Sequence, residues 1–78
     1  MAELPMVSGK EALAVFERAG SRYVRRKESH IIMTKSGMPV NLSIPDHKEL
    51  DRGTLRKLIR LSHLGIEEFI ELLRGSGG

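Results

Sequence analysis

The hydrophobic periodicity of the chain changes twice, and this change constrains the fold more than any other feature. Apolar residues recur at helical spacing over residues 12–19, alternate at every second position over 40–44, and return to helical spacing over 55–73. Helical spacing indicates an amphipathic helix, whereas alternation indicates a strand with one buried face. Because 78 residues suffice for only one hydrophobic core, the pattern predicts a single α+β domain.

Capping residues bound the first predicted helix. Ser8 and Glu11 have the spacing of a capping box, in which each side chain accepts a hydrogen bond from the backbone amide of the other residue. Gly20 stands where a left-handed residue commonly ends a helix. These signals predict a helix over residues 9–19.

Three strand-like segments follow. Residues 21–27 and 29–34 contain β-branched or aromatic side chains, a turn is expected at 35–37, and residues 40–44 alternate until Pro45 ends the strand. The short connections predict an antiparallel meander. The inward face of the middle strand stays open, because two alternating sets are compatible with burial: His30 and Ile32, or Ser29, Ile31 and Met33.

Two further helices complete the predicted fold. Asp51 is a suitable N-cap for a helix that begins near Arg52, and residues 63–65 interrupt that helix before a last short one over 66–73. Six apolar residues of the predicted helices are expected in the core: Leu13, Phe16, Leu55, Leu58, Phe69 and Ile70.

These elements assemble most simply as two layers. We predict an α+β domain of order αβββα(α) over residues 1–74, in which the main helices cover one face of a three-stranded antiparallel sheet. Residues 75–78 consist of Gly and Ser, and we expect them to form a flexible tail.

Positive charge is concentrated in the middle of the chain. The net charge is +3, and between residues 18 and 35 Glu28 is the only carboxylate among several Lys and Arg. A concentrated basic surface is typical of proteins that bind polyanions. The absence of cysteine excludes disulfides and thiolate chemistry, and the longest apolar run, residues 31–33, is too short to span a membrane. We expect a cytoplasmic protein that contacts no membrane.

Histidine is the side chain in this sequence best suited to proton transfer near neutral pH. His30, His47 and His63 belong to no metal-binding motif, and no glycine-rich phosphate loop is present. RNA carries its own nucleophile, the 2′-hydroxyl, so its cleavage needs only proton transfer and stabilisation of the phosphate charge. RNA cleavage without a metal or other cofactor is therefore chemically accessible to a lone histidine among Lys and Arg.

Five short motifs occur together in one order and spacing. They are Leu4–Glu11, Glu28–His30, Pro45–Leu50, Gly53–Ile59 and Glu67–Phe69. In this order the motifs resemble the HicA family, the mRNA-interferase toxins of type II toxin-antitoxin systems. The resemblance covers nearly the whole chain.

The resemblance implies a fold, an activity and a partner. The fold is similar to that of double-stranded-RNA-binding domains, which agrees with the element order reached from periodicity. The implied activity is cleavage of mRNA, single-stranded or structured, with His30 as the catalytic residue, and the implied partner is a HicB-type antitoxin that covers the site.

Two features depart from the family pattern. The glycine that usually precedes the Ser-His pair is Glu28 here, which places an anion close to the reactive site and is expected to weaken RNA binding. The loop after His47 is also shorter than the family's common length.

The candidate RNA-binding residues are mostly basic and lie near His30 or on the helix that begins near Arg52. They are Arg25, Arg26, Lys27, Ser29, Lys35, His47, Thr54, Arg56 and Lys57. Each has a structural alternative, since Lys and Arg also protect edge strands from aggregation or solvate a helix face.

Other interpretations stay open at the level of the sequence. By residue type alone, His30 fits a hydrogen-bonded strand histidine better than a catalytic one, and the motif match is what favours catalysis. His63 is better placed to cap a helix than to react. The main functional alternative is a non-catalytic RNA-binding module of the same fold. A further alternative is a basic face that docks an acidic protein.

Overall fold

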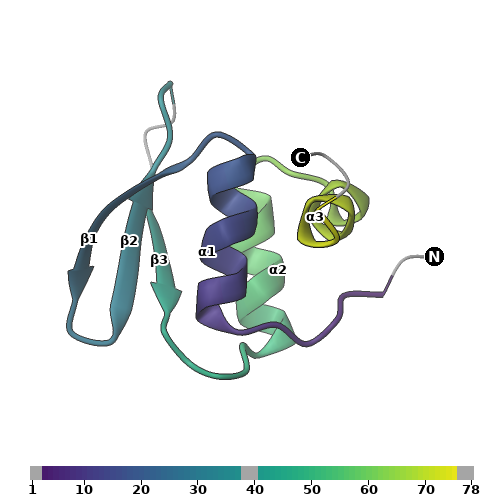
Figure 1. The fold of residues 1–78 in the computed structure, drawn as a ribbon, viewed down its shortest axis with the longest axis horizontal. Coiled ribbons are helices and arrows are strands. Elements are labelled where there is room, and N and C mark those ends of the chain that lie inside the picture. Colours follow the sequence, from purple (N-terminus) through teal and green to yellow (C-terminus); the bar gives the residue numbers. More distant parts are fainter. Residues whose placement is uncertain (1–2, 38–40, 76–78) are drawn as a thin grey trace.

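The computed structural model describes residues 3–37 and 41–75, and it confirms the predicted order of elements. The elements are α1 (Gly9–Arg18), β1 (Arg22–Lys27), β2 (His30–Thr34), β3 (Leu42–Pro45), α2 (Arg52–Leu61) and α3 (Ile66–Leu73). Figure 1 shows α1 and α2 on the same side of the sheet, with α3 farther from it. The fold is the expected α+β arrangement, similar to a double-stranded-RNA-binding domain. Within the described residues, no helix is long and apolar enough to cross a membrane.

The sheet has the order β1-β2-β3, and both pairs of neighbouring strands are antiparallel. Ile31 pairs with Ile44, and Met33 pairs with Leu42. All four side chains are buried. Because side chains alternate between the two faces of a strand, Ile31 and Met33 point to the helices and His30 points to the opposite face. This answers the question that the sequence left open.

The predicted caps form as expected at two helix starts. The Ser8 hydroxyl accepts a hydrogen bond from the Glu11 amide at 3.0 Å, and Glu11 Oε1 accepts one from the Ser8 amide at 2.8 Å. Asp51 Oδ2 accepts hydrogen bonds from the amides of Gly53 and Thr54. These contacts satisfy amides that would otherwise lack a partner at the first turn of α1 and α2.

The core lies between the sheet and the helices. Phe16 of α1 and Phe69 of α3 are fully buried with ring centroids 5.7 Å apart. Leu55 and Leu58 are also buried, as predicted. The core residues are Leu4, Val7, Ala12, Val15, Phe16, Ile31, Met33, Leu42, Ile44, Leu50, Leu55, Leu58, Ile59 and Phe69. Leu13, also predicted in the core, is half-buried and packs against it. Ile70 is half-buried and is not among the core residues.

Element boundaries differ from the predicted ones by one or two residues. α1 ends at Arg18, and β3 begins at Leu42 and includes Pro45, which pairs with His30. Residue 40, the predicted start of this strand, lies outside the described residues. Of the predicted tail, Gly75 closes the last turn through a hydrogen bond from its amide to the Leu72 carbonyl, and 76–78 lie outside the described residues.

Gly9 holds the start of α1 against the end of β3. Its amide donates a hydrogen bond to the His47 carbonyl at 2.9 Å. A Cβ atom at this position would lie 2.2 Å from the Pro45 carbonyl oxygen. Only glycine therefore permits this close approach, which sets the position of α1 relative to the segment that follows β3.

Candidate functional site

His30 lies at the end of the sheet where β2 begins, on the face turned away from the helices. Its direct partners across the neighbouring strands are Lys27 of β1 and Pro45 of β3. Directly paired residues place their side chains on the same face, with Cβ atoms about 5 Å apart. His30 and Lys27 are both exposed. The sheet therefore presents an imidazole beside an ammonium group, both open to solvent.

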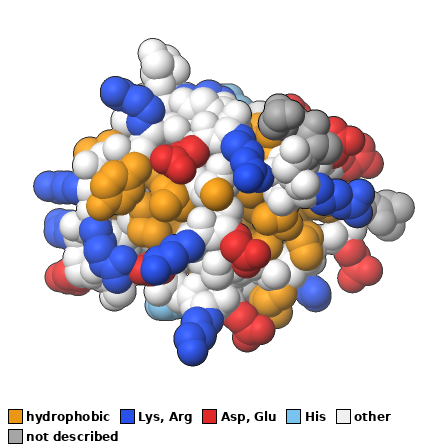
Figure 2. Space-filling model, viewed as in Figure 1, with side chains coloured by type: hydrophobic (Ala, Val, Ile, Leu, Met, Phe, Trp, Pro, Cys, Tyr) orange, Lys and Arg blue, Asp and Glu red, His pale blue; other side chains and the backbone are white. Residues whose placement is uncertain are grey.

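The same face carries further cations along β1. Arg25 pairs with Ile32, and Arg22 pairs with Thr34. Ile32 and Thr34 lie on the same side of β2 as His30, since they follow it by two and four residues. We call the row His30, Lys27, Arg25 and Arg22 the basic sheet face. Figure 2 shows Lys and Arg side chains on the left of the molecule, where Figure 1 places the sheet.

An irregularity in β1 brings the two arginines to one face. The register shifts between Tyr23 and Arg25, where β1 contains one residue more than the facing segment of β2. In a regular strand, residues 22 and 25 would point to opposite faces. Sequence reasoning missed Arg22 as a site residue, because a bulge leaves no clear signal in this sequence.

The turn before His30 has an unusual backbone conformation. Glu28 has a φ angle of 57°, in the left-handed region that favours glycine. The Ser29 carbonyl accepts a hydrogen bond from the Asp46 amide at 2.8 Å. Glycine would adopt this conformation without strain, whereas Glu28 adopts it at an energetic cost.

Arg26 is engaged within the protein. Its Nη1 atom forms an ion pair with Asp46 Oδ2, and its Nε atom donates a hydrogen bond to the Glu28 carbonyl at 3.2 Å. Its direct partner on β2 is Ile31, whose side chain points to the core. Arg26 is therefore not part of the basic sheet face, in contrast to Arg25 and Lys27.

The other candidate residues near this end of the sheet occupy loops. Ser29 is exposed in the β1–β2 turn, and His47 is exposed two residues after Pro45. Lys35 follows β2 directly and is half-buried, at the opposite end of this strand from His30. Ser29 and His47 thus accompany His30, whereas Lys35 does not.

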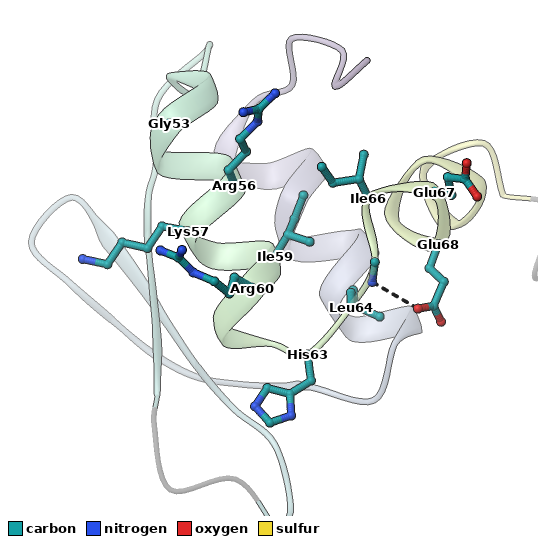
Figure 3. Close-up of a pocket in the computed structure, with 11 residues that line it drawn as sticks. Gly53, Arg56, Lys57, Ile59, Arg60, His63, Leu64, Ile66, Glu67 and Glu68 are labelled. Carbon is teal, nitrogen blue, oxygen red and sulfur yellow. Dashed lines mark hydrogen bonds between the residues drawn. The ribbon is translucent and has the colours of Figure 1, made fainter. Parts of the chain in front are cut away.

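A second basic group lies on α2. Arg56, Lys57 and Arg60 are exposed and line an open groove between α2 and α3. Figure 3 shows that Glu67 and Glu68 lie across this groove, where Glu68 accepts a hydrogen bond from the Gly65 amide at 3.1 Å. The groove therefore carries both signs of charge.

The start of α2 offers less to a phosphate than the sequence indicates. The amides of Gly53 and Thr54 already donate to the Asp51 carboxylate, at 3.1 and 3.3 Å. Thr54 is half-buried and sits beside this carboxylate. Its amide is therefore satisfied without a ligand.

The expectation that His63 caps α2 was wrong in detail. Ser62 is the C-cap, and its hydroxyl donates a hydrogen bond to the Ile59 carbonyl at 2.8 Å. His63 follows it with a φ angle of 63°, and its backbone amide donates to the Arg60 carbonyl. The left-handed backbone of His63, rather than its imidazole, ends the helix.

The chemistry that this candidate site could perform depends on His30 and its cationic neighbours. Among the described residues, no group of three His, Asp or Glu side chains is arranged to hold a metal ion. An imidazole can take or give a proton near neutral pH, and Lys and Arg can stabilise negative charge on a phosphate. The basic sheet face therefore suits proton transfer on a phosphate-bearing substrate.

Comparison with known families agrees with the resemblance seen in the motifs. A family model described as the HicA toxin of bacterial toxin-antitoxin matches residues 9–66. The matched span runs from the first residue of α1 to the first residue of α3 and includes the whole sheet. No curated protein matches the chain.

Proposed function

Because the chain belongs to the HicA family of toxins from bacterial toxin-antitoxin systems, we propose that it is an endoribonuclease that cleaves mRNA with His30 as its catalytic residue. The observation that carries this proposal is the cross-strand pair of His30 and Lys27 on an exposed face of the sheet. The pair places a group that transfers protons beside a group that stabilises phosphate charge.

The proposed reaction uses the nucleophile that RNA supplies. The His30 imidazole takes the proton of a 2′-hydroxyl, the 2′-oxygen forms a bond to the adjacent phosphorus, and the bond from phosphorus to the 5′-oxygen breaks. The 5′-oxygen leaves with a proton from water, the hydroxide that remains takes back the proton held by His30, and the other product ends in a cyclic phosphate. Lys27 stabilises the additional negative charge of the transition state. No cofactor takes part in these steps.

The basic sheet face and the nearby loops are proposed to hold the RNA backbone. Arg22, Arg25 and Lys27 provide phosphate contacts on the face of His30, and Ser29 and His47 lie at its rim. The proposed site of action is the cytoplasm, where mRNA is found. A HicB-type antitoxin is the proposed partner. By covering His30, this antitoxin would exclude RNA from the site.

A cleavage assay tests the proposal directly. Purified protein is incubated with a long single-stranded RNA in the presence of EDTA, and the fragments are resolved on a denaturing gel. His30→Ala should abolish cleavage. His63→Asn is the matched control, because it removes an exposed histidine between α2 and α3, outside the basic sheet face. Asparagine tolerates the left-handed backbone at this position.

The outcomes separate the proposal from its alternative. Cleavage by the wild type and by His63→Asn, but not by His30→Ala, would support a ribonuclease that depends on His30 and on no metal. RNA that stays intact with all three proteins, yet shifts in a binding assay, would instead indicate the non-catalytic RNA-binding module.

A further inference from the structure

Arg26 joins three segments of the chain around His30. From β1, its Nε atom donates a hydrogen bond to the Glu28 carbonyl in the turn, and its Nη1 atom pairs with the Asp46 carboxylate after β3. The Asp46 amide in turn donates a hydrogen bond to the Ser29 carbonyl. Figure 1 shows that the β1–β2 turn and the end of β3 lie at the same end of the sheet. We call these contacts the Arg26–Asp46 clamp.

The clamp holds two residues next to His30, one that precedes it in the chain and one that faces it across the sheet. Ser29 precedes His30 in the chain, and its carbonyl is bound by Asp46. Pro45 faces His30 across the sheet, and it directly precedes Asp46. The backbone on which the His30 side chain depends is therefore fixed from two directions, although the His30 side chain itself is exposed.

The strained backbone of Glu28 is a feature that the Arg26–Asp46 clamp can hold in place. A residue other than glycine keeps a left-handed φ angle only when surrounding contacts hold it there. The Arg26 side chain supplies such a contact, because its hydrogen bond fixes the Glu28 carbonyl. Without it, the turn would lose one of the contacts that hold this φ angle, and His30 follows Glu28 by only two residues.

The exposure of the pair indicates a local role. The Arg26 side chain is 52% exposed and that of Asp46 13%. An ion pair with one partner half exposed adds little to global stability, because water screens its charges. The ion pair can still fix the conformation of the turn without a large contribution to the free energy of unfolding. The net effect of the pair is therefore expected in the position of His30 more than in the stability of the fold.

We propose that Arg26 and Asp46 are positioning residues that keep the turn 28–29, and thereby the His30 imidazole, in its reactive geometry. Arg26 then acts through the backbone rather than as a contact to RNA phosphate. This inference rests on the proposed function, because it names residues that act through the proposed catalytic histidine.

Three single variants and one double variant test the clamp. Arg26→Ala and Asp46→Ala each remove one half of the ion pair, and the double variant removes both. Arg25→Ala is the matched control, because it deletes the neighbouring arginine that lies on the basic sheet face. Each protein is measured for kcat and KM of RNA cleavage. The {1H}-15N heteronuclear NOE of residues 28–30 reports the order of the turn without any substrate.

The expected results differ in kind between the variants. Arg26→Ala and Asp46→Ala should each lower kcat by about 10- to 100-fold with KM little changed, since a small misplacement of a catalytic group costs this much. The double variant should lose no more than Arg26→Ala alone, because that substitution already removes both the ion pair and the hydrogen bond to the Glu28 carbonyl. Arg26→Ala and Asp46→Ala should each also lower the NOE of residues 28–30. Arg25→Ala should raise KM and leave the NOE unchanged.

Asp46→Ala is the decisive variant. Removing a carboxylate should strengthen phosphate binding if charge alone mattered, whereas the clamp requires a loss of kcat. A raised KM and unchanged kcat in Arg26→Ala, with normal turn dynamics, would overturn the inference and make Arg26 a phosphate contact. If an alanine variant fails to fold, Arg26→Met and Asp46→Asn are measured in the same way, because each removes one charge of the pair while keeping a side chain of similar size.

The substrate-free measurement keeps this inference separate from the proposed function. If the wild type cleaves no RNA, the proposed function fails, and the NOE decides whether the clamp orders the turn. An unchanged NOE in both alanine variants would overturn the clamp, whatever the activity of the wild type.

Discussion

Arg22 and Arg25 point to the same face of β1, although they are three positions apart. The register shift between Tyr23 and Arg25 places Arg22 opposite Thr34 and Arg25 opposite Ile32, and both of these partners lie on the His30 face of β2. The bulge therefore extends the cationic row from Lys27 along the strand. Three cations in line with an exposed histidine match a phosphate backbone better than isolated surface charges do.

We expect Arg22→Ala and Arg25→Ala each to weaken RNA binding and its dependence on salt. Each phosphate contact contributes about −0.7 to the slope of log K against log salt concentration on single strands. Each variant should reduce the magnitude of the slope by about this amount, as measured by fluorescence anisotropy with a labelled RNA. Arg74→Ala removes an exposed arginine beyond α3 and is the control of equal charge. An equal loss in the control would mean that net charge, not this face, binds RNA.

The helices could be predicted closely because their signals are local. Ser8 and Asp51 cap the helices that they were expected to cap, and the last helix has the predicted bounds of 66–73. Features that depend on distant parts of the chain could not be predicted. The bulge in β1 is defined only by its pairing with β2, and Arg26 meets Asp46 twenty positions away.

The same distinction holds for the candidate site. Arg25 and Lys27 lie beside His30 because the β1–β2 register places them there, whereas Arg26 between them turns to Asp46. A sequence of three consecutive basic residues cannot show which of them faces solvent on one side of a sheet. That assignment needs the inward face of β2, which Ile31 defines by its burial.

Glu28→Gly should stabilise the fold, since glycine adopts a positive φ angle without the steric penalty of a Cβ atom. We expect Glu28→Gly to be about 1 kcal/mol more stable than Glu28→Ala, which has equally lost the carboxylate but keeps the strained backbone. Urea denaturation of both variants measures the difference. Equal stability of the two would show that the left-handed turn carries no strain.

The charge of Glu28 can be tested apart from its backbone. Glu28→Gln keeps the size of the side chain and the left-handed strain while removing the anion near His30. We expect it to bind RNA more tightly than the wild type, because a carboxylate repels phosphate. Fluorescence anisotropy at low salt measures the change, and affinity equal to that of the wild type would exclude Glu28 as an inhibitor of RNA binding.

Gly9→Ala should destabilise the protein. The added methyl group would lie 2.2 Å from the Pro45 carbonyl oxygen, so α1 or the end of β3 must move. Forced displacement in a packed region costs about 1–3 kcal/mol, and urea denaturation measures the loss. Gly53→Ala is the control, because its added methyl group meets only the end of the Asp51 side chain at 3.0 Å. A loss no greater than that of the control would show that this approach is not a constraint.

The two basic groups of the molecule are expected to contribute unequally to RNA binding. Arg56 and Lys57 line a groove whose other wall carries Glu67 and Glu68, and these carboxylates repel phosphate. The basic sheet face has no such wall among its paired residues, which are Ile32, Thr34, Ser43 and Pro45 across the strands. The sheet should therefore bind RNA more strongly than the groove.

A pair of double variants with equal loss of charge measures this difference. Arg22→Ala with Arg25→Ala should weaken RNA binding more than Arg56→Ala with Lys57→Ala, as measured by fluorescence anisotropy at one salt concentration. Glu67→Gln with Glu68→Gln should bring the groove closer to the sheet in affinity, because the repulsion is removed. A larger loss from the α2 pair than from the β1 pair would place the main RNA surface on the helix, and His30 would then lie outside it.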